Sequence, residues 1–267
     1  MTLDISFSKA PHKNTEAAVL CFYNNKEPSP CVSSLNYEFS GFVDHVLEKS
    51  KSFQGKFGEV EILMLPDGAP YHYVVLLGLG EKGDIENISA EKLGGKLLVA
   101  IEARKIETIE FYSDNEHPQC AEISVHIAAG MKLRSYKFDQ YKSPKPAADK
   151  TITLNKTHFV LFDDDSANDL YAEQAAIIEG TFWARNLVNE PPNVLYPDAY
   201  AKIIKAQLKP LGVEIDILDE KKMRKLGMGA LLAVGQGSDN APRMVVMRWK
   251  GDKDSPMLRR LLLWVRA

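Results

Sequence analysis

The sequence predicts an α/β protein, because short apolar, β-prone runs alternate with amphipathic stretches along its 267 residues. This alternation is typical of a mixed or parallel sheet that is flanked by helices. Hydrophobic residues make up 45% and charged residues 26% of the chain, a mixture that can bury a core. A polar segment with two prolines, residues 142–150, is the best candidate for a boundary between two domains.

The first part of the chain is expected to form several strands and helices in alternation. Apolar β-prone runs predict strands at residues 3–7, 17–23, 60–64, 73–79, 108–112 and 157–162. Apolar residues at helical spacing predict helices at residues 37–49, 89–104 and 121–134. Ser89 is a good N-cap residue for the second of these helices, and Pro66-Asp67-Gly68 predicts a turn.

A long helix is expected from about Asn168 to the paired prolines Pro191 and Pro192, which disfavour helical geometry. One line on this helix carries Leu170, Ile177, Ala184 and Val188, with Tyr171, Ile178 and Phe182 beside it. Pro197 suits the first position of a further helix to Leu208. Beyond it we expect a strand at 213–218, a helix at 220–226, an apolar run at 231–234, a strand at 243–249, a hairpin-like turn at 250–256 and one more strand.

Charge and composition narrow the classes of partner. The net charge is −3, with both signs interspersed, so no basic stripe favours nucleic acid and no polybasic segment favours a membrane surface. The N-terminus lacks the features of a secretory signal, and no window approaches the ~20 apolar residues that span a bilayer. A cytoplasmic protein that binds small molecules or peptides is expected. The three cysteines, Cys21, Cys31 and Cys120, are widely spaced and predict buried or free thiols.

Gly78-Leu-Gly-Glu-Lys-Gly83 matches the dinucleotide-binding pattern G-x-G-x-x-G and follows a predicted strand. The following helix is expected only at Ser89, and no acidic residue ends a second strand about twenty residues further on. A nicotinamide-dependent oxidoreductase therefore remains a minor alternative, which NAD-dependent fluorescence quenching would reveal.

Other candidate groups have ordinary structural explanations. The histidines, at 12, 45, 72, 117, 126 and 158, include no i, i+4 pair and are expected on the surface or satisfied in the core. The carboxylates of Asp163–Asp165 precede a helix and are expected to form its solvated N-terminal cap. Ser238 lies in Gly-Gln-Gly-Ser without a Gly-x-Ser-x-Gly elbow, so a turn is the expected structure there.

Two segments carry a family resemblance. Ala184-Arg-Asn-Leu-Val-Asn-Glu-Pro-Pro-Asn-Val-Leu-Tyr-Pro197 and, about thirty residues later, Lys225-Leu-Gly-Met-Gly-Ala-Leu-Leu-Ala-Val-Gly-Gln-Gly-Ser238 resemble the opening of the catalytic domain of the leucyl aminopeptidase (cytosol aminopeptidase) family. The resemblance implies an N-terminal macro-like α/β domain at 1–145, a linker and first-strand region at 146–167, and the incomplete start of the α/β catalytic domain at 168–256. Residues 257–267 are expected to be an aberrant tail. Tyr196 stands where the family commonly has Thr or Asn.

The same resemblance implies hydrolysis of peptides at the N-terminal residue with two divalent metal ions, Mn or Zn, and a hexamer of full-length relatives. The family's metal ligands lie in Gly-Lys-Gly, Phe-Asp-Thr/Ser-Gly-Gly and Asn-Thr-Asp-Ala-Glu-Gly-Arg motifs, none of which occurs in this sequence. We therefore assign no catalytic, cofactor-binding or metal-binding residue. The chain is expected to bind no metal, to be inactive alone and not to form the hexamer.

The tail from Met257 to Ala267 is basic and rich in leucine, where the family has an apolar strand and the Gly-Lys-Gly turn. A shifted reading frame across Leu263–Ala267 permits Gly-Lys-Gly, so we expect a frameshift upstream of Leu263. An incomplete sheet would expose an apolar edge and favour association. A different class of function remains open, in which the N-terminal domain is a non-catalytic module that binds an ADP-ribose-like ligand or DNA.

Overall fold

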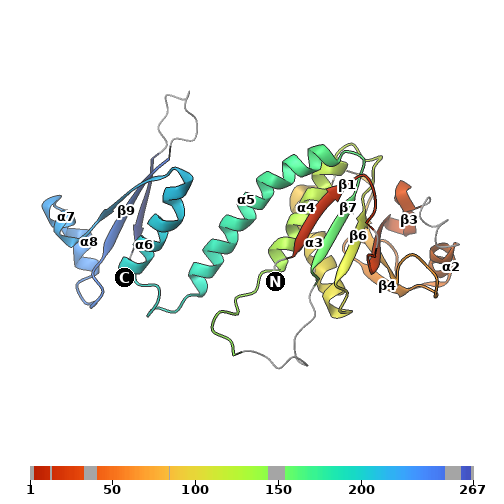
Figure 1. Cartoon of the computed structure of the whole chain (residues 1–267), viewed down its shortest axis with the longest axis horizontal. Helices are drawn as coiled ribbons and strands as arrows, with labels where there is room; N and C mark the ends of the chain where they lie inside the picture. Colours follow the sequence, from red (N-terminus) through yellow and green to blue (C-terminus); the bar gives the residue numbers. More distant parts are fainter. Residues whose placement is uncertain are drawn as a thin grey trace. The chain divides into compact units, whose positions relative to one another are not determined.

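The computed structural model of the chain describes residues 3–12, 14–32, 41–83, 85–143, 154–249 and, by their backbone only, 260–265. The chain divides into two compact units, Met1–Ala184 and Arg185–Ala267 (Figure 1). Each unit has its own sheet. The α/β class that the sequence predicts is confirmed in both.

The first unit is built on a mostly parallel sheet with the order β1-β7-β6-β2-β5-β4, and β3 pairs with β2 outside this path. Only β4 and β3 run antiparallel to their neighbours. The strands are β1 (Asp4–Ser8), β2 (Ala17–Tyr23), β3 (Glu27–Pro28), β4 (Val60–Met64), β5 (Tyr73–Gly80), β6 (Thr108–Tyr112) and β7 (Lys156–Val160). The predicted mixed or parallel sheet is therefore confirmed.

Both faces of this sheet are covered. The helices of the unit include α2 (Phe42–Lys49), α3 (Asn87–Ala103), α4 (Cys120–Arg134) and most of α5 (Asp164–Asn189), and the short η1 (Asn24–Lys26) follows β2. One core cluster joins Phe111 and Phe159 of the sheet to Leu97 of α3 and Met131 of α4. A second cluster joins Phe22 and Leu76 to Val43 of α2. Alternate strand residues supply the two clusters, which is why β2 and β5 are apolar throughout.

The strand β7 lies between β1 and β6, parallel to both. It follows the proline-containing segment that the sequence marked as a domain boundary, yet it completes the sheet of the first unit. The compact unit runs to Ala184, since Ala167 and Tyr171 of α5 also pack in its core, whereas the family resemblance places the end of the N-terminal domain near residue 145. The local composition of residues 142–150 does not reveal that β7 pairs with β1 and β6.

Two helices begin earlier than predicted. α3 starts at Asn87, with Glu86 as a cap residue that makes no side-chain hydrogen bond, so the prediction of Ser89 as N-cap was wrong. Ile85 and Ala90, on either side of this start, pack in the same apolar core and fix where the chain enters the helix. α5 starts at Asp164, because the Ala167 N–H donates to the Asp163 carbonyl.

The predicted apolar line on α5 is not its buried side. Leu170 is 39% and Ile177 61% exposed, whereas Ile178 is 3% exposed and Ala167 is fully buried. Tyr171 also faces the core, where its ring lies 5.2 Å from that of Phe7. The sequence pattern left the buried side of α5 open, since apolar residues occupy adjacent sides of this helix.

The second unit is an antiparallel sheet, β10-β9-β8, with helices beside it. Its elements are α6 (Pro197–Leu208), η3 (Lys209–Leu211), β8 (Glu214–Leu218), α7 (Glu220–Lys225), α8 (Gly229–Val234), β9 (Arg243–Arg248) and β10 (Arg260–Val265). Met244 and Val246 pack with Met223 of α7 and Leu232 of α8, while the alternate residues Val245 and Met247 are also buried. Figure 1 shows α6 on one side of β9 and α7 and α8 on the other.

A predicted strand and a predicted apolar run of the second unit are present as β10 and as part of α8. The strand expected after the 250–256 turn is present as β10, which pairs with β9, while the turn itself lies outside the described residues. The apolar run 231–234 is helical, as part of α8. In the first unit, the predicted helix 37–49 is seen as α2 from Phe42, and its first part also lies outside the described residues.

Candidate functional site

The two segments that resemble the family are called the signature segments here, and the first, residues 184–197, contains the connection between α5 and α6. α5 ends at Asn189, and Pro191 and Pro192 follow one residue later. The N–H groups of Val194 and Leu195 both donate to the Pro191 carbonyl at 2.9 Å, which closes a turn. α6 then begins with Pro197 at its first position, and Tyr196 is extended without a side-chain cap bond. The departure at Tyr196 thus leaves the helix start in place.

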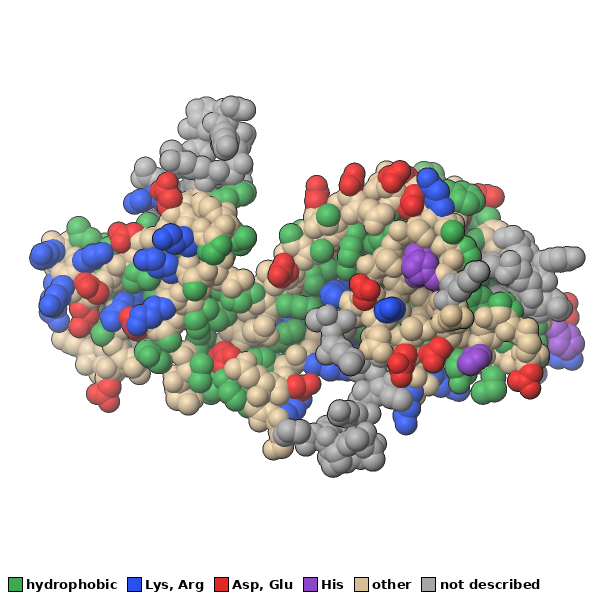
Figure 2. Space-filling view, viewed as in Figure 1, with side chains coloured by type: hydrophobic (Ala, Val, Ile, Leu, Met, Phe, Trp, Pro, Cys, Tyr) green, Lys and Arg blue, Asp and Glu red, His purple; other side chains and the backbone are tan. Residues whose placement is uncertain are grey.

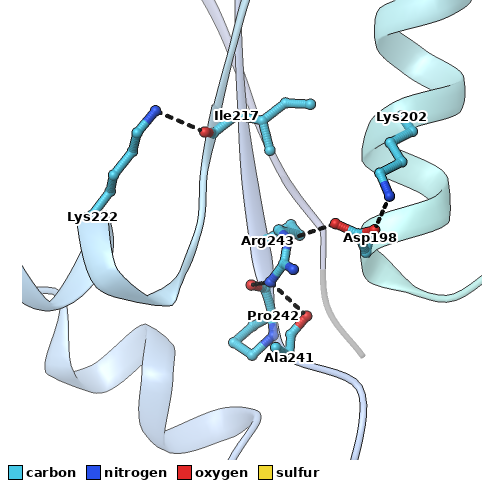
Figure 3. Close-up of polar contacts among 7 residues, drawn as sticks. All are labelled: Asp198, Lys202, Ile217, Lys222, Ala241, Pro242 and Arg243. Carbon is cyan, nitrogen blue, oxygen red and sulfur yellow. Dashed lines mark hydrogen bonds and ion pairs between the residues drawn. The ribbon is translucent and has the colours of Figure 1, made fainter.

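Asp198 and Arg243 connect the start of α6 to the start of β9 (Figure 3). The Arg243 Nε donates to Asp198 Oδ1 at 2.9 Å, and Lys202 Nζ lies 2.6 Å from Asp198 Oδ2. The pKa of Asp198 lies below its ordinary value, first because of the hydrogen bond from Lys202 and then because of the one from Arg243. An ionised carboxylate held by two cations is a structural anchor, since it has no tendency to take up a proton near neutral pH.

Arg243 also holds the loop that leads into β9. Its Nη1 donates to the carbonyls of Pro242 at 2.9 Å and Ala241 at 3.3 Å. Only 19% of this side chain is exposed. The guanidinium therefore uses its planar set of donors to fix a loop, a strand and a helix at one point.

The second signature segment, Lys225–Ser238, contains α8 and the turns around it. Gly227 has φ = 72°, which ends α7 in a left-handed conformation. The Ser238 N–H donates to the Gly235 carbonyl at 3.2 Å, and Ser238 Oγ accepts from the Asn240 N–H at 3.1 Å. Ser238 is a turn residue, as predicted, and its hydroxyl has no neighbouring base among the hydrogen bonds of the described residues.

This segment lines a polar cleft of about 670 Å³ within the second unit. Gln236, Ser238, Glu220 and Arg224 supply polar side chains to its wall, and glycines supply much of the rest. Glu220 and Arg224 face each other at 3.8 Å. The cleft can hydrogen-bond a polar molecule, but its described lining contains no histidine or cysteine that would act as a base, nucleophile or soft metal ligand.

Basic side chains gather around α7 with acidic ones among them (Figure 2). Lys222 Nζ lies 3.4 Å from Asp216 and donates to the Ile217 carbonyl at 3.3 Å (Figure 3). The Asp219 side chain caps α7 by accepting from the Lys222 N–H, and this bond lowers its pKa. Several of these charged side chains thus form ion pairs or hydrogen bonds with other groups of the second unit.

The glycines of Gly78–Gly83 serve packing of the first unit. A Cβ on Gly78 would lie 2.1 Å from the Lys56 carbonyl oxygen, and Gly80 has φ = 91° at the end of β5. α3 begins only at Asn87, so no helix opens on the last glycine of the pattern. The close approach at Gly78 and the positive φ at Gly80 explain why glycine occupies these two positions, with no need for a bound dinucleotide.

A small cavity lies at the carboxyl ends of β2, β5 and β6. Its lining includes Cys21, Tyr23, Asp114 and Cys120, and Tyr23 Oη donates to Asp114 Oδ2 at 2.7 Å. Burial raises the pKa of the Cys120 thiol to about 12 and also raises that of Cys21. The cavity measures about 20 Å³, room for roughly one water molecule. It is too small for an ADP-ribose-like ligand.

Most of the remaining predicted groups have separate neighbours, although the rings of His12 and His158 stack on each other. Asp164 and Asp165 occupy the first turn of α5, as predicted for a cap, and Lys9 lies 3.3 Å from Asp164. Among the histidines, His126 faces Glu91 at 3.2 Å and His45 faces Lys49 at 3.0 Å. Across the described residues, no three His, Cys, Asp or Glu side chains are grouped so that they could hold a metal ion. The metal pair implied by the family resemblance therefore does not fit these residues.

One buried ionisable residue was missed by sequence reasoning. Glu110 is fully buried in the middle of β6. Its signal in the sequence was a carboxylate within the apolar run Thr-Ile-Glu-Phe-Tyr, since Glu is rarely buried without partners. His158 lies opposite it on β7.

Comparison with protein families decides the relationship. The model of the cytosol aminopeptidase family, N-terminal domain, matches residues 18–145, and that of the catalytic domain of the same family matches residues 182–261. This chain belongs to the cytosol aminopeptidase family. The order of the two matches agrees with the order of the two units.

The family member is similar to bacterial proteins along nearly its whole length. It is 32% identical to a probable cytosol aminopeptidase of Rickettsia bellii over 262 residues, which are 96% of this chain and 52% of that relative. It is 40% identical to a probable cytosol aminopeptidase of Methylorubrum extorquens over 212 residues, 77% of this chain and 40% of that relative. The chain spans about half the length of the curated relatives it matches.

Solved structures show the same fold. A mutant of tomato leucine aminopeptidase matches with a TM-score of 0.76 and 21% identity, over 95% of this chain and 52% of that one. The bottromycin maturation enzyme BotP in complex with Mn matches with a TM-score of 0.65 and 22% identity, over 88% of this chain and 45% of that one. Within the described residues of the family member, no helix is both long and apolar enough to span a bilayer.

Proposed function

We propose that this chain provides the N-terminal domain and the beginning of the catalytic domain of an aminopeptidase that releases N-terminal amino acids from peptides. The observation that carries the proposal is the pair of family matches in sequence order, at 18–145 and 182–261. The names of the relatives support peptide hydrolysis in the cytosol. BotP in complex with Mn supports a divalent ion such as Mn for the complete enzyme, for which the family resemblance implies Mn or Zn.

We further propose that the 267 residues alone do not hydrolyse peptides. In a two-metal hydrolase, the metal ligands and the residues that orient them act together, so a partial set gives no partial activity. The described residues lack a group of side chains that could hold one such ion. The Asp198–Arg243 contact and the Lys225–Ser238 segment then have a structural role, which is to position α6, α8 and β9 within the catalytic domain.

The test is hydrolysis of leucine amide by the purified chain with added manganese chloride, with the Rickettsia bellii relative as the positive control. We expect turnover by the relative and none by this chain above the blank. Circular dichroism on the same sample establishes that the chain is folded, so that a negative result is not caused by unfolding. Turnover by the chain that a chelator abolishes would contradict the proposed inactivity.

Binding of the metal is tested separately by isothermal titration with manganese and zinc. We expect no saturable binding of either ion by this chain. Two tightly bound ions per chain would show that residues of this sequence do form the metal site. Size-exclusion chromatography with light scattering examines assembly, for which we propose that the chain does not form a hexamer.

A further inference from the structure

A buried carboxylate lies in the middle of the first unit's sheet. Glu110 of β6 is fully buried. The hydroxyl of Tyr71 and the backbone N–H of His12 donate to its carboxylate, and the hydroxyl of Tyr112 does so at 3.2 Å. The hydroxyls of Tyr71 and Tyr112 lie 2.6 Å apart. Because the proton of Tyr71 goes to Glu110, Tyr112 is the donor here and shares its single proton between Tyr71 Oη and Glu110. Glu110 thus receives hydrogen bonds from three donors, one of which belongs to the loop between β1 and β2.

His158 lies directly across from Glu110 on β7 and is 5% exposed. Its Nδ1 is 2.8 Å from Ser6 Oγ, and its Nε2 is 2.9 Å from Ser8 Oγ and 3.2 Å from the Ala10 carbonyl. Ser8 Oγ donates its proton to the same carbonyl at 2.8 Å. Nε2 must therefore carry the imidazole proton, and Nδ1 accepts from Ser6.

This assignment has two consequences. The neutral imidazole of His158 is fully hydrogen-bonded, so the neutral form suits the site. Ser8 is not an activated nucleophile, because its proton points to a carbonyl and the facing nitrogen is a donor. The Ser–His contact is therefore part of a structural arrangement.

The ring of His12 stacks on the ring of His158, with centroids 3.7 Å apart and an angle of 18° between the planes. His12 itself is exposed. The loop between β1 and β2 is thus held to the sheet by the His12 ring, by the His12 N–H on Glu110 and by the Ala10 carbonyl. Each of these contacts is made to the side chain of His158 or of Glu110, both of which are ionisable.

We propose that the stacked His12 and His158 rings form a pH-sensitive latch, which holds the β1–β2 loop against the sheet at neutral pH and releases it in mild acid. Two charged imidazoles at this separation repel each other, and water is largely excluded from the inner ring. The carboxylate of Glu110 already accepts from three donors. Movement of His12 into solvent relieves the repulsion.

The titration of His158 agrees with this direction. Burial, the largest effect, lowers its pKa below the ordinary value, and His12 lowers it further, while the Ala10 carbonyl and Glu110 act in the opposite sense. The other titratable groups of the site, Tyr71 and Tyr112, face Glu110. Because the pKa is lowered in the held state, the latch is fully stable above about pH 6.5 and weakens as the pH falls through the lowered value.

The test is hydrogen exchange of the full chain at about pH 7.5 and about pH 5.5, with rates corrected for intrinsic exchange. We expect the protection of amides between residues 9 and 16 to fall at least roughly threefold at the lower pH. Peptides from α4, which supplies none of the residues of the latch, serve as the internal reference. Equal protection of the loop at both pH values would overturn the latch.

Two single variants identify the responsible groups. His12→Gln removes the outer imidazole from an exposed position, so the fold is kept. We expect a smaller loss of loop protection in acid than in the unaltered chain, because the burial of His158 remains, and a higher pKa of His158 in an NMR titration. His45→Gln, on α2, is the matched control and should behave as the unaltered chain does. A full acid response in His12→Gln, or its loss in His45→Gln, would refute the assignment.

Discussion

The close approach of α3 and α4 makes a sharp prediction about two adjacent glycines. A Cβ on Gly94 would lie 2.0 Å from the carbonyl oxygen of Ile127, a backbone atom that cannot rotate away. Ordinary contact begins at 3.4 Å, so the two helices must separate by about 1.4 Å to admit a methyl group. A Cβ on Gly95 would meet only the Cβ of Arg134, at 3.9 Å.

Gly94→Ala and Gly95→Ala should therefore change stability in opposite directions. Overpacking costs about 1–3 kcal/mol and outweighs the gain of ~0.5–1 kcal/mol from replacing glycine within a helix. Only the gain applies to Gly95→Ala. Thermal and urea unfolding, followed by circular dichroism, should show a Tm lowered by several degrees for the first variant and raised slightly for the second. Equal effects of the two variants would refute the packing argument.

Three further predictions concern other sites. Gly78→Ala should destabilise the first unit, because its Cβ would lie 2.1 Å from a backbone carbonyl oxygen, whereas Gly83→Ala, with nothing within 4 Å, should be neutral in the same melts; destabilisation by both would contradict this. The pKa of Asp198 is lowered by a lysine and an arginine, so its contribution is present above about pH 4 and lost as the pH falls further. Asp198→Asn should thus lower Tm at neutral pH and not at about pH 2, and a constant difference would exclude the ion pairs as the cause. Burial raises the pKa of the Cys21 thiol, and that of Cys120 to about 12. Ellman's reagent should label these two thiols at about pH 8 only after denaturant is added, and rapid labelling of the native chain would count against this.

Strand positions were predictable because the apolar runs are short and bounded by turns. Val60–Met64 and Thr108–Tyr112 form strands with the predicted bounds. Helix starts were less predictable. α3 begins at Asn87, two residues before Ser89, because Ile85 packs against the core and fixes where the chain enters the helix. The packed side of α5 could not be predicted, because apolar residues lie on adjacent sides of the helix, and Ile178 is buried whereas Ile177 is exposed.

Some site residues could be identified from the sequence and others could not. The two signature segments are contiguous in sequence, so they could be identified without a structure, and the family match agrees with them. The Glu110 cluster could not be predicted, because Ser6 and His158 are 152 residues apart and meet only through the pairing of β1 with β7. Such pairings are set by the whole sheet and leave little local pattern.

The pairing of β1 with β7 also determines when this unit becomes complete during synthesis. Asp4 of β1 pairs with Lys156 of β7, which is synthesised 152 residues later (156 − 4). At ~5–20 residues per second, the strand at the amino terminus remains without that partner for roughly 8–30 s on the ribosome. β6 ends 44 residues before Lys156 (156 − 112), so for the last ~2–9 s of this interval it is an open edge that chaperones can recognise. A proteolytic cut near residue 145 that separated the two pieces would recreate this immature state in a finished protein.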